Sequence, residues 1–330
     1  METKIILAAN EYGIARAKQK AGDQWSVELF LEGQDIRCLA SDPHNPKRVY
    51  AGTQGEGVLR SEDGGQTWQT CGLGGNIVKS IAVSPRQMDT VYAGLKPASM
   101  AVSHDGGRSW EELTGFRRIP WRWWWFSPAE KPGQAYVQAI AISPSDPDVI
   151  LAGIEFGAVV RSSDGGLTWS GHRSGALRDC HDLKFHATNG DWAYEAGGTG
   201  GGASFSRDGG QTWRKMKQGL AKNYGVACAA DALKPEVWYV SVAPSPNKAY
   251  GAEAEAYLYR SDGGADWHPI GWEPHPMGKM PIALVTDSRE PGHLYAGLTN
   301  GDIWHTADYG ESWDRLPFNL KGIWKPMIVL

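Results

Sequence analysis

The sequence predicts an all-β fold, a seven-bladed β-propeller made of four-stranded antiparallel blades. First, an eight-residue motif recurs from Asp63 to Asp308 at a mean spacing of 49 residues, close to the spacing of known propeller repeats. Second, each repeat holds several short apolar runs separated by turn residues, which is typical of all-β domains. Third, the 330 residues include 42 Gly and 16 Trp, an excess that the repeated motif mostly explains.

The repeated motif has the form Ser-x-Asp-Gly-Gly-x-Thr/Ser-Trp, as in Ser61 to Trp68. Its glycines can adopt positive φ, and its Asp and Ser side chains can bond to nearby backbone amides, so we expect a tight turn. The Trp that ends it can pack between neighbouring sheets. An eroded copy from Lys20 to Trp25 keeps the Gly and the Trp. The recognisable copies place structural aspartates at Asp63, Asp105, Asp164, Asp208, Asp262 and Asp308.

Each repeat has the same order of elements. An apolar strand is followed by a second strand that often ends in Tyr-Ala-Gly, by a third that runs into the motif, and by a fourth that begins near the Trp. This order predicts one domain over residues 1–330. The blades are expected at 36–74, 77–115, 136–175, 181–219, 224–271, 280–317, and 322–330 together with 4–31. In the last blade the C-terminal strand would pair with the N-terminal strands, which closes the ring and removes exposed edges.

The motif resembles the Asp-box (BNR) repeat of sialidases, two-propeller xyloglucanases, sortilin-type receptors and the photosystem II assembly factor propeller. The resemblance covers nearly the whole chain, which as a whole is similar to bacterial WD40/YVTN/BNR-like repeat proteins labelled glycosyl hydrolase. It implies that the boxes lie on peripheral turns and that their aspartates are structural. Residues 116–120 also match the sialidase Arg-Ile-Pro motif in letters, but they follow the second recognisable box instead of preceding the first.

Composition narrows the functional classes. The formal net charge is −4, so no overall attraction to nucleic acid is expected. No run of 18 apolar residues is present, so we predict no membrane span. The N-terminus lacks the pattern of a signal peptide, and the four cysteines form no CxxC pair. We therefore expect a cytoplasmic protein with reduced thiols, and we assign it no cofactor and no metal.

Candidate catalytic residues come from the loops expected at the mouth of the central channel. Glu11, Glu56, Glu155 and Glu195 lie on separate blades and could converge there. Glycoside hydrolysis needs two carboxyl groups about 5–5.5 Å apart for retention or about 6.5–9.5 Å apart for inversion. We take Glu155, Glu195 and Glu56 as the catalytic candidates. The alternative is that they are solvated turn residues or partners of nearby arginines and lysines.

The longest loop between blades, residues 113–138, interleaves Trp121 and Trp123 to Trp125 with arginines. Such a surface suits sugar stacking, cation recognition or single-stranded nucleic acid, and it also suits membrane interfaces. The alternative is that the rings plug the channel or form a subunit contact. Candidate ligand-binding residues on this and the other mouth loops are Arg118, Trp123, Trp124, Arg178, His181, Tyr224, His275, Asn300 and Asp302.

Three functions remain open on the sequence alone. The favoured one is a propeller directed at a sugar or another small polar ligand, with a glycoside hydrolase-like enzyme as one form of it. The second is a non-enzymatic scaffold or assembly factor that binds a protein partner, or itself, through the Arg/Trp loop at residues 116–126. The third is a metal-dependent enzyme that uses the mouth histidines His172, His181 and His275, although no HxH or HxxxH pair supports it.

Overall fold

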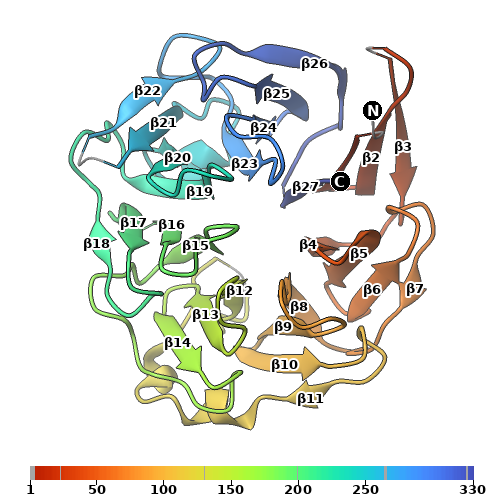
Figure 1. Ribbon diagram of the computed structural model, residues 1–330, viewed down its shortest axis with the longest axis vertical. Coiled ribbons are helices and arrows are strands. Elements are labelled where there is room, and N and C mark those ends of the chain that lie inside the picture. The colour runs from red at the N-terminus through yellow and green to blue at the C-terminus, as the bar shows by residue number, and fades with distance from the viewer. Residues whose placement is uncertain (1–3, 23, 130, 199, 264–265, 325) are drawn as a thin grey trace.

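The computed structural model describes residues 4–22, 24–129, 131–198, 200–263, 266–324 and 326–330. Seven small antiparallel sheets surround a central channel (Figure 1), so the prediction of a seven-bladed all-β propeller is confirmed. Short helical segments complete the described elements: η1 (Thr114–Arg118), η2 (Arg122–Trp124) and α1 (Pro246–Ala249). The eroded motif copy includes residue 23, and the copy around Asp262 includes residues 264 and 265, which lie outside the described residues.

The strands of each blade follow one another outward from the channel. Blade 1 contains β4 (Ile36–Asp42), β5 (Asn45–Thr53), β6 (Val58–Ser61) and β7 (Gln69–Thr70), and blade 2 contains β8 (Ile77–Val83), β9 (Val91–Lys96), β10 (Ser99–Ser103) and β11 (Glu111–Glu112). Blade 3 contains β12 (Val137–Ile142), β13 (Val149–Ile154) and β14 (Val159–Ser163), and blade 4 contains β15 (Cys180–Phe185), β16 (Ala193–Gly197), β17 (Gly202–Ser206) and β18 (Arg214–Lys215). Blade 5 contains β19 (Tyr224–Ala230), β20 (Val237–Ala243), β21 (Tyr257–Asp262) and β22 (His268–Ile270), and blade 6 contains β23 (Pro281–Thr286), β24 (Leu294–Leu298), β25 (Asp302–Thr306) and β26 (Asp314–Asn319).

Blade 7 joins the two ends of the chain. It contains β27 (Met327–Val329), β1 (Ile5–Asn10), β2 (Gly13–Gln19) and β3 (Trp25–Phe30). β27 runs antiparallel to β1, with Ile6 opposite Val329 and Leu7 opposite Ile328. The predicted closure of the ring by the C-terminal strand is therefore confirmed.

Blade 3 has three regular strands, and an irregular segment takes the outer position. There the Arg161 amide donates to Ser170 Oγ (3.1 Å) and the Val159 amide donates to His172 Nδ1 (3.2 Å). Two side chains thus replace backbone acceptors of a fourth strand. Burial lowers the pKa of His172 to about 4, so the ring stays neutral and keeps this acceptor role.

The repeated turns have one common hydrogen-bond pattern. In the first, Asp63 Oδ1 accepts from the amides of Gln66 and Thr67 (both 2.9 Å), and Oδ2 accepts from the Thr67 hydroxyl (2.6 Å). The Ser61 hydroxyl donates to the same carboxylate (2.8 Å) and accepts from the Gly65 amide (2.8 Å). In the turns at Asp105, Asp164, Asp208 and Asp308, the carboxylate likewise accepts a hydrogen bond from the backbone amide four residues later. These carboxylates are occupied in holding their own turns.

Third-strand arginines link three of these turns to the preceding blade. Arg16 Nε donates to the Gly64 carbonyl (2.8 Å), and Arg60 donates to the equivalent Gly106 carbonyl (2.7 Å). Arg161 makes the same link to Gly209 (2.9 Å). We did not predict this contact from the sequence. In blades 1 and 3 the arginine stands directly before the motif serine, and that position could have indicated it.

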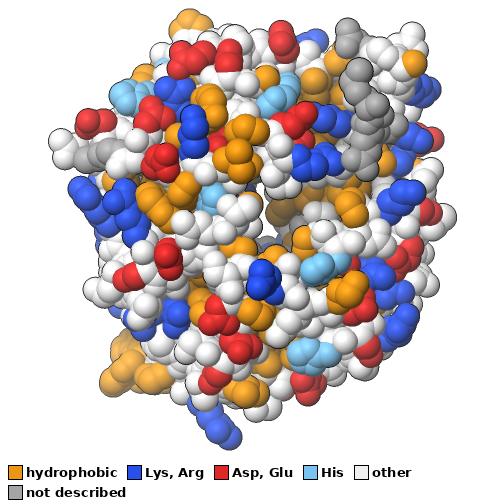
Figure 2. All heavy atoms as spheres, in the orientation of Figure 1, with side chains coloured by type: hydrophobic (Ala, Val, Ile, Leu, Met, Phe, Trp, Pro, Cys, Tyr) orange, Lys and Arg blue, Asp and Glu red, His pale blue; other side chains and the backbone are white. Residues whose placement is uncertain are grey.

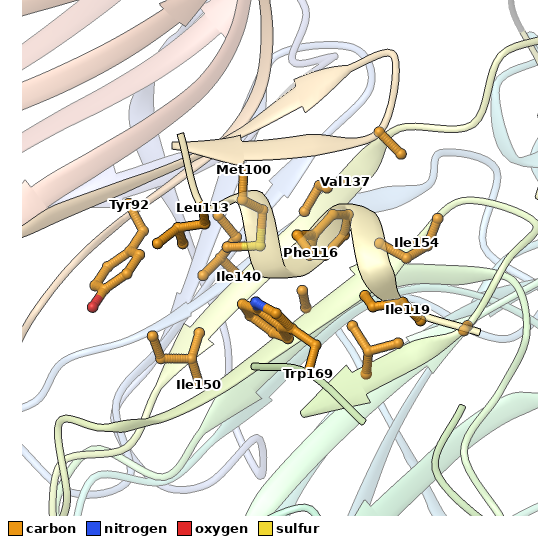
Figure 3. Close-up of a cluster of buried hydrophobic side chains, with 14 of the residues drawn as sticks. Tyr92, Met100, Leu113, Phe116, Ile119, Val137, Ile140, Ile150, Ile154 and Trp169 are labelled. Carbon is orange, nitrogen blue, oxygen red and sulfur yellow. The ribbon is translucent and has the colours of Figure 1, made fainter. Parts of the chain in front are cut away.

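The cores lie between adjacent blades. Between blades 2 and 3, Phe116 and Ile119 from the long loop pack with Trp169 from the third turn (Figure 3). The rings of Phe116 and Trp169 meet edge to face, with centroids 5.3 Å apart. The start of the long loop is therefore part of a core, and this fixes where its exposed remainder lies.

Candidate functional site

A β-bulge recurs in the inner strands of blades 1 to 6. In each, the register shifts by one residue near the start of the strand. A bulge leaves one residue outside the ladder and redirects its side chain. The six extra residues all line the channel, and they are Arg37, Lys79, Gln138, His181, Val226 and Ile282. Blades 1 to 4 thus present polar groups at this position, whereas blades 5 and 6 present apolar ones.

These residues line a cavity of about 970 Å³, and Figure 2 shows the ring hollowed at its centre. Its lining also includes Glu155, Tyr250 and Trp324 from loops and Tyr224, the first residue of β19. Tyr250 follows α1 in the long loop between β20 and β21, and its ring lies parallel to that of Trp324 with centroids 6.5 Å apart. The mouth therefore combines charged groups with stacked aromatic rings.

A compact cluster of ionisable groups lies at this mouth. One ligand-type atom from each of Glu155, Asp179 and His181 lies within 4.8 Å of the other two. Glu155 directly follows β13, Asp179 precedes β15, and His181 is the bulge residue of β15. The exposed fractions are 6% for Glu155, 2% for Asp179 and 9% for the His181 side chain. Within the described residues, this is the one group of three or more such side chains this close together.

Hydrogen bonding orients the His181 ring. Nδ1 lies 2.6 Å from the Gly225 carbonyl oxygen, so Nδ1 carries a proton and donates it there. Nε2 then faces Asp179, whose Oδ1 is 3.6 Å away. Burial disfavours the charged ring, but Asp179 and the Glu155 carboxylate outweigh burial and raise the pKa of His181. These two carboxylates thus favour the protonated form of the ring.

Aromatic side chains flank the cluster. The Tyr224 ring is 4.9 Å from that of His181. Burial, with added repulsion from Tyr250, Glu155 and Asp179, raises the pKa of Tyr224. Desolvation of the hydroxyl group, although 43% of the residue is exposed, raises the pKa of Tyr250 to about 12. Both phenols are neutral at physiological pH, so they can donate hydrogen bonds to a bound molecule.

Two buried lysines share one tyrosine at the mouth. Nζ of Lys79 is 4.2 Å from the centroid of the Tyr136 ring and Nζ of Lys96 is 5.7 Å from it. Lys79 is 7% exposed and Lys96 is 6% exposed. The Tyr136 carbonyl oxygen also accepts a hydrogen bond from the Glu155 amide (3.1 Å). Positive and negative buried groups are therefore neighbours in one region of the channel mouth.

Glycine allows the loop after β16 to approach the cluster. A Cβ on Gly198 would lie 2.2 Å from Asp179 Oδ2 and 2.9 Å from atoms of both His181 and Tyr224. Any side chain at this position would displace the cluster. Gly198 therefore serves close packing against acidic and aromatic groups.

The three candidate catalytic glutamates do not come together. Glu155 lies in the cluster, but Glu56 is exposed on the turn between β5 and β6. Glu195 lies within β16 and is fully buried, where one carboxylate oxygen accepts from the Leu177 amide (2.9 Å) and the Ser204 hydroxyl (2.6 Å). Burial raises the pKa of Glu195 to about 8. Its role is to hold the loop before β15, behind the cluster.

Of the candidate ligand-binding residues, His181 belongs to the cluster and Tyr224 flanks it, and the others lie apart from it. His275 packs on the rings of Tyr257 and Tyr259, with centroids 5.1 and 6.4 Å away. Asn300 and Asp302 bond to each other (2.9 Å) in one turn. Arg178 is exposed and reaches the Gly157 carbonyl at 3.5 Å. Of the three mouth histidines named from the sequence, His181 is the one that lines the channel cavity.

The long loop carries its tryptophans away from the channel. Trp121, Trp123 and Trp124 are 69%, 69% and 66% exposed, and the rings of Trp123 and Trp124 stack at 4.5 Å. Arg118 is also exposed, on η1. In Figure 1 this yellow segment lies at the rim of the ring, and Figure 2 shows hydrophobic side chains gathered at the lower-left edge of the same view. Arg122 fixes the segment by donating to the Ala98 carbonyl (2.6 Å).

Comparison by sequence identifies no relative: no family model matches the chain, and no curated protein is similar to it. Comparison by structure finds other propellers. A GH74 xyloglucanase from Xanthomonas campestris superimposes with a TM-score of 0.69 at 19% identity, over 93% of this chain and 50% of that one. The chain thus spans half the length of that enzyme.

YCF48 proteins are also similar in structure. YCF48 bound to a D1 peptide superimposes with a TM-score of 0.58 at 17% identity, over 86% of this chain and 82% of that one. YCF48 from Cyanidioschyzon merolae gives 0.60 at 12% identity, over 89% and 88% of the two chains. The structural similarity shows that the chain has the same propeller fold. At identities this low it leaves the activity open. In the described part of the chain, the helices are too short or too polar to act as transmembrane segments.

Proposed function

We propose that the protein binds a small polar ligand, of the carbohydrate class, at the mouth of its central channel. The observation that carries this proposal is the group of five buried charged side chains around the mouth: Lys79, Lys96, Glu155, Asp179 and His181. Removing charges from water is costly, so such groups concentrate where they contact ligands or reacting atoms. A ligand rich in hydroxyl groups can form hydrogen bonds with such groups.

Each part of the mouth suits a sugar. Carboxylates accept hydrogen bonds from hydroxyl groups, and the lysines and neutral tyrosines donate them. The parallel rings of Tyr250 and Trp324 offer an apolar face to a pyranose ring. Carboxylate oxygens of Glu155 and Asp179 lie within 4.8 Å of each other. If the site is hydrolytic, this is nearer to the spacing of about 5–5.5 Å that accompanies retention of configuration than to the spacing of about 6.5–9.5 Å that accompanies inversion.

The test is calorimetric titration of the full chain with a panel of neutral, acidic and amino sugars. We expect saturable 1:1 binding of at least one of them, weakened at least about tenfold by Glu155→Gln. The matched control is Glu56→Gln, which removes the same charge from an exposed turn and should bind as the wild type does. Absence of binding across the panel, or equal binding by both variants, contradicts the proposal.

A second candidate function, a scaffold that binds a protein partner, rests on the exposed rings of Trp121, Trp123 and Trp124. Large aromatic rings are rarely left in water outside interaction surfaces. Crosslinking followed by mass spectrometry should then recover a partner with the wild type and lose it with Trp123→Ala/Trp124→Ala. Glu155→Gln should retain that partner, since the mouth takes no part in this contact. Recovery that is the same with and without the two tryptophans would argue against the scaffold.

A further inference from the structure

We propose that Glu155, Asp179 and His181 form a binding site for a divalent transition-metal ion at the channel mouth. The donor set of one imidazole and two carboxylates suits zinc, manganese or ferrous iron. It differs from the set of three mouth histidines considered from the sequence, because His172 and His275 are used elsewhere in the fold. Metal binding here does not depend on whether a sugar also binds.

The geometry of the three donors is the first support. Their atoms lie within 4.8 Å of one another. A metal bonded to each at about 2.0–2.2 Å requires donors about 3–4 Å apart, so a contraction of about 1 Å assembles the site. Glu155 follows a strand of blade 3, whereas Asp179 and His181 flank the first residue of β15 in blade 4. Rigid strands therefore position the donors on both sides.

The orientation of His181 is the second, independent support. Metal-bound histidines usually donate their other ring N–H to a carbonyl or a carboxylate, which fixes the tautomer. Here Nδ1 donates to the Gly225 carbonyl at 2.6 Å, and the side chain is 9% exposed. Nε2 is thereby left facing Asp179, whose Oδ1 lies 3.6 Å away.

Charge is the third support. Two carboxylates and a neutral imidazole together carry −2, which a divalent cation neutralises. The groups facing the ring are Asp179, Glu155 from blade 3, and Tyr224 with the Gly225 carbonyl from blade 5.

The experiment titrates chelator-treated full-length protein with Zn²⁺ and Mn²⁺ by calorimetry and with Co²⁺ by visible absorption. We expect 1:1 binding and a Co²⁺ spectrum that contains a histidine ligand. Glu155→Gln and Asp179→Asn should each weaken binding at least about tenfold, and His181→Ala should remove the Co²⁺ spectrum. If His181→Ala fails to fold, as judged by circular dichroism, the two near-isosteric variants decide the question.

The control is His104→Ala, because His104 is 60% exposed and its Nε2 lies 3.5 Å from Glu111, as in an adventitious surface site. It should bind metal as the wild type does. The inference is overturned if the wild type shows no saturable binding, or if the three site variants bind as His104→Ala does. Sugar titrations with and without metal separate the two proposals, since either can fail while the other holds.

Discussion

The repeated turns are alike from blade to blade, whereas the residues at the channel mouth differ between the same blades. Five of the turns satisfy an aspartate with the same hydrogen bonds within one motif, whichever blade carries them. At the mouth, the bulge position is equivalent in six blades, yet it holds Arg37, Lys79, Gln138, His181, Val226 and Ile282. Repetition therefore reports how the ring is built, and departure from repetition marks the place where we propose that a ligand binds.

The largest expected effect lies in the repeated part. Trp213 is 7% exposed, packs in the core between blades 3 and 4, and donates from Nε1 to the Gly210 carbonyl (3.2 Å). Trp213→Ala should lower the free energy of unfolding by about 3–5 kcal/mol, because it leaves a cavity. Urea unfolding followed by circular dichroism measures this. A loss below about 1 kcal/mol would mean that the motif tryptophans do not hold the blades together.

The next effect lies beneath the mouth, at Glu195. Its pKa is about 8 because it is buried, whereas in the unfolded chain it ionises near pH 4.3. A raised folded-state pKa means that stability falls as the pH rises between these two values, by at most about 1.4 kcal/mol per pH unit. Glu195→Gln keeps an acceptor for the Leu177 amide and the Ser204 hydroxyl, so it should remove this dependence.

Denaturant unfolding of the wild type and Glu195→Gln at pH 5 and pH 8 checks this expectation. The variant should be the more stable protein at pH 8, and the difference should shrink at pH 5. If the wild type and the variant differ in free energy of unfolding by the same amount at both pH values, Glu195 is ionised in the folded protein.

A smaller effect is expected for a single turn aspartate. Hydrogen bonds from the Ser312 hydroxyl and amide lower the pKa of Asp308 to about 2. Asp308→Ala should cost about 1–2 kcal/mol at neutral pH, since several bonds to a half-buried carboxylate are lost. A lowered pKa stabilises above the unfolded value, and this stability disappears as the pH falls from about 4 to 2. Thermal unfolding of both proteins should therefore converge at low pH, and a constant gap would contradict this reasoning.

The sequence predicted the ring and its closure because a turn motif with fixed bonds repeats at a constant spacing. It placed Glu155, His181 and Tyr224 at the mouth because loop position follows from the blade pattern. It did not single out Lys79 or Tyr136, because a bulge shifts register by one residue and strand alternation alone does not show it. Glu195 was expected in a loop, but β16 extends to Gly197 and encloses it.

The smallest expected effect on stability comes from the tryptophans that the repeat does not explain. Trp123 and Trp124 stack on each other at the rim and are about two-thirds exposed, so Trp123→Ala/Trp124→Ala should change the free energy of unfolding by no more than about 0.5 kcal/mol. Retention on a hydrophobic-interaction column should nevertheless drop, since two large apolar faces leave the surface. Comparison with Trp213→Ala under the same conditions separates the two classes of tryptophan. A destabilisation close to that of Trp213→Ala would mean that the rim rings support the core through Phe116, and the division between repeated framework and recognition surface would not hold for this loop.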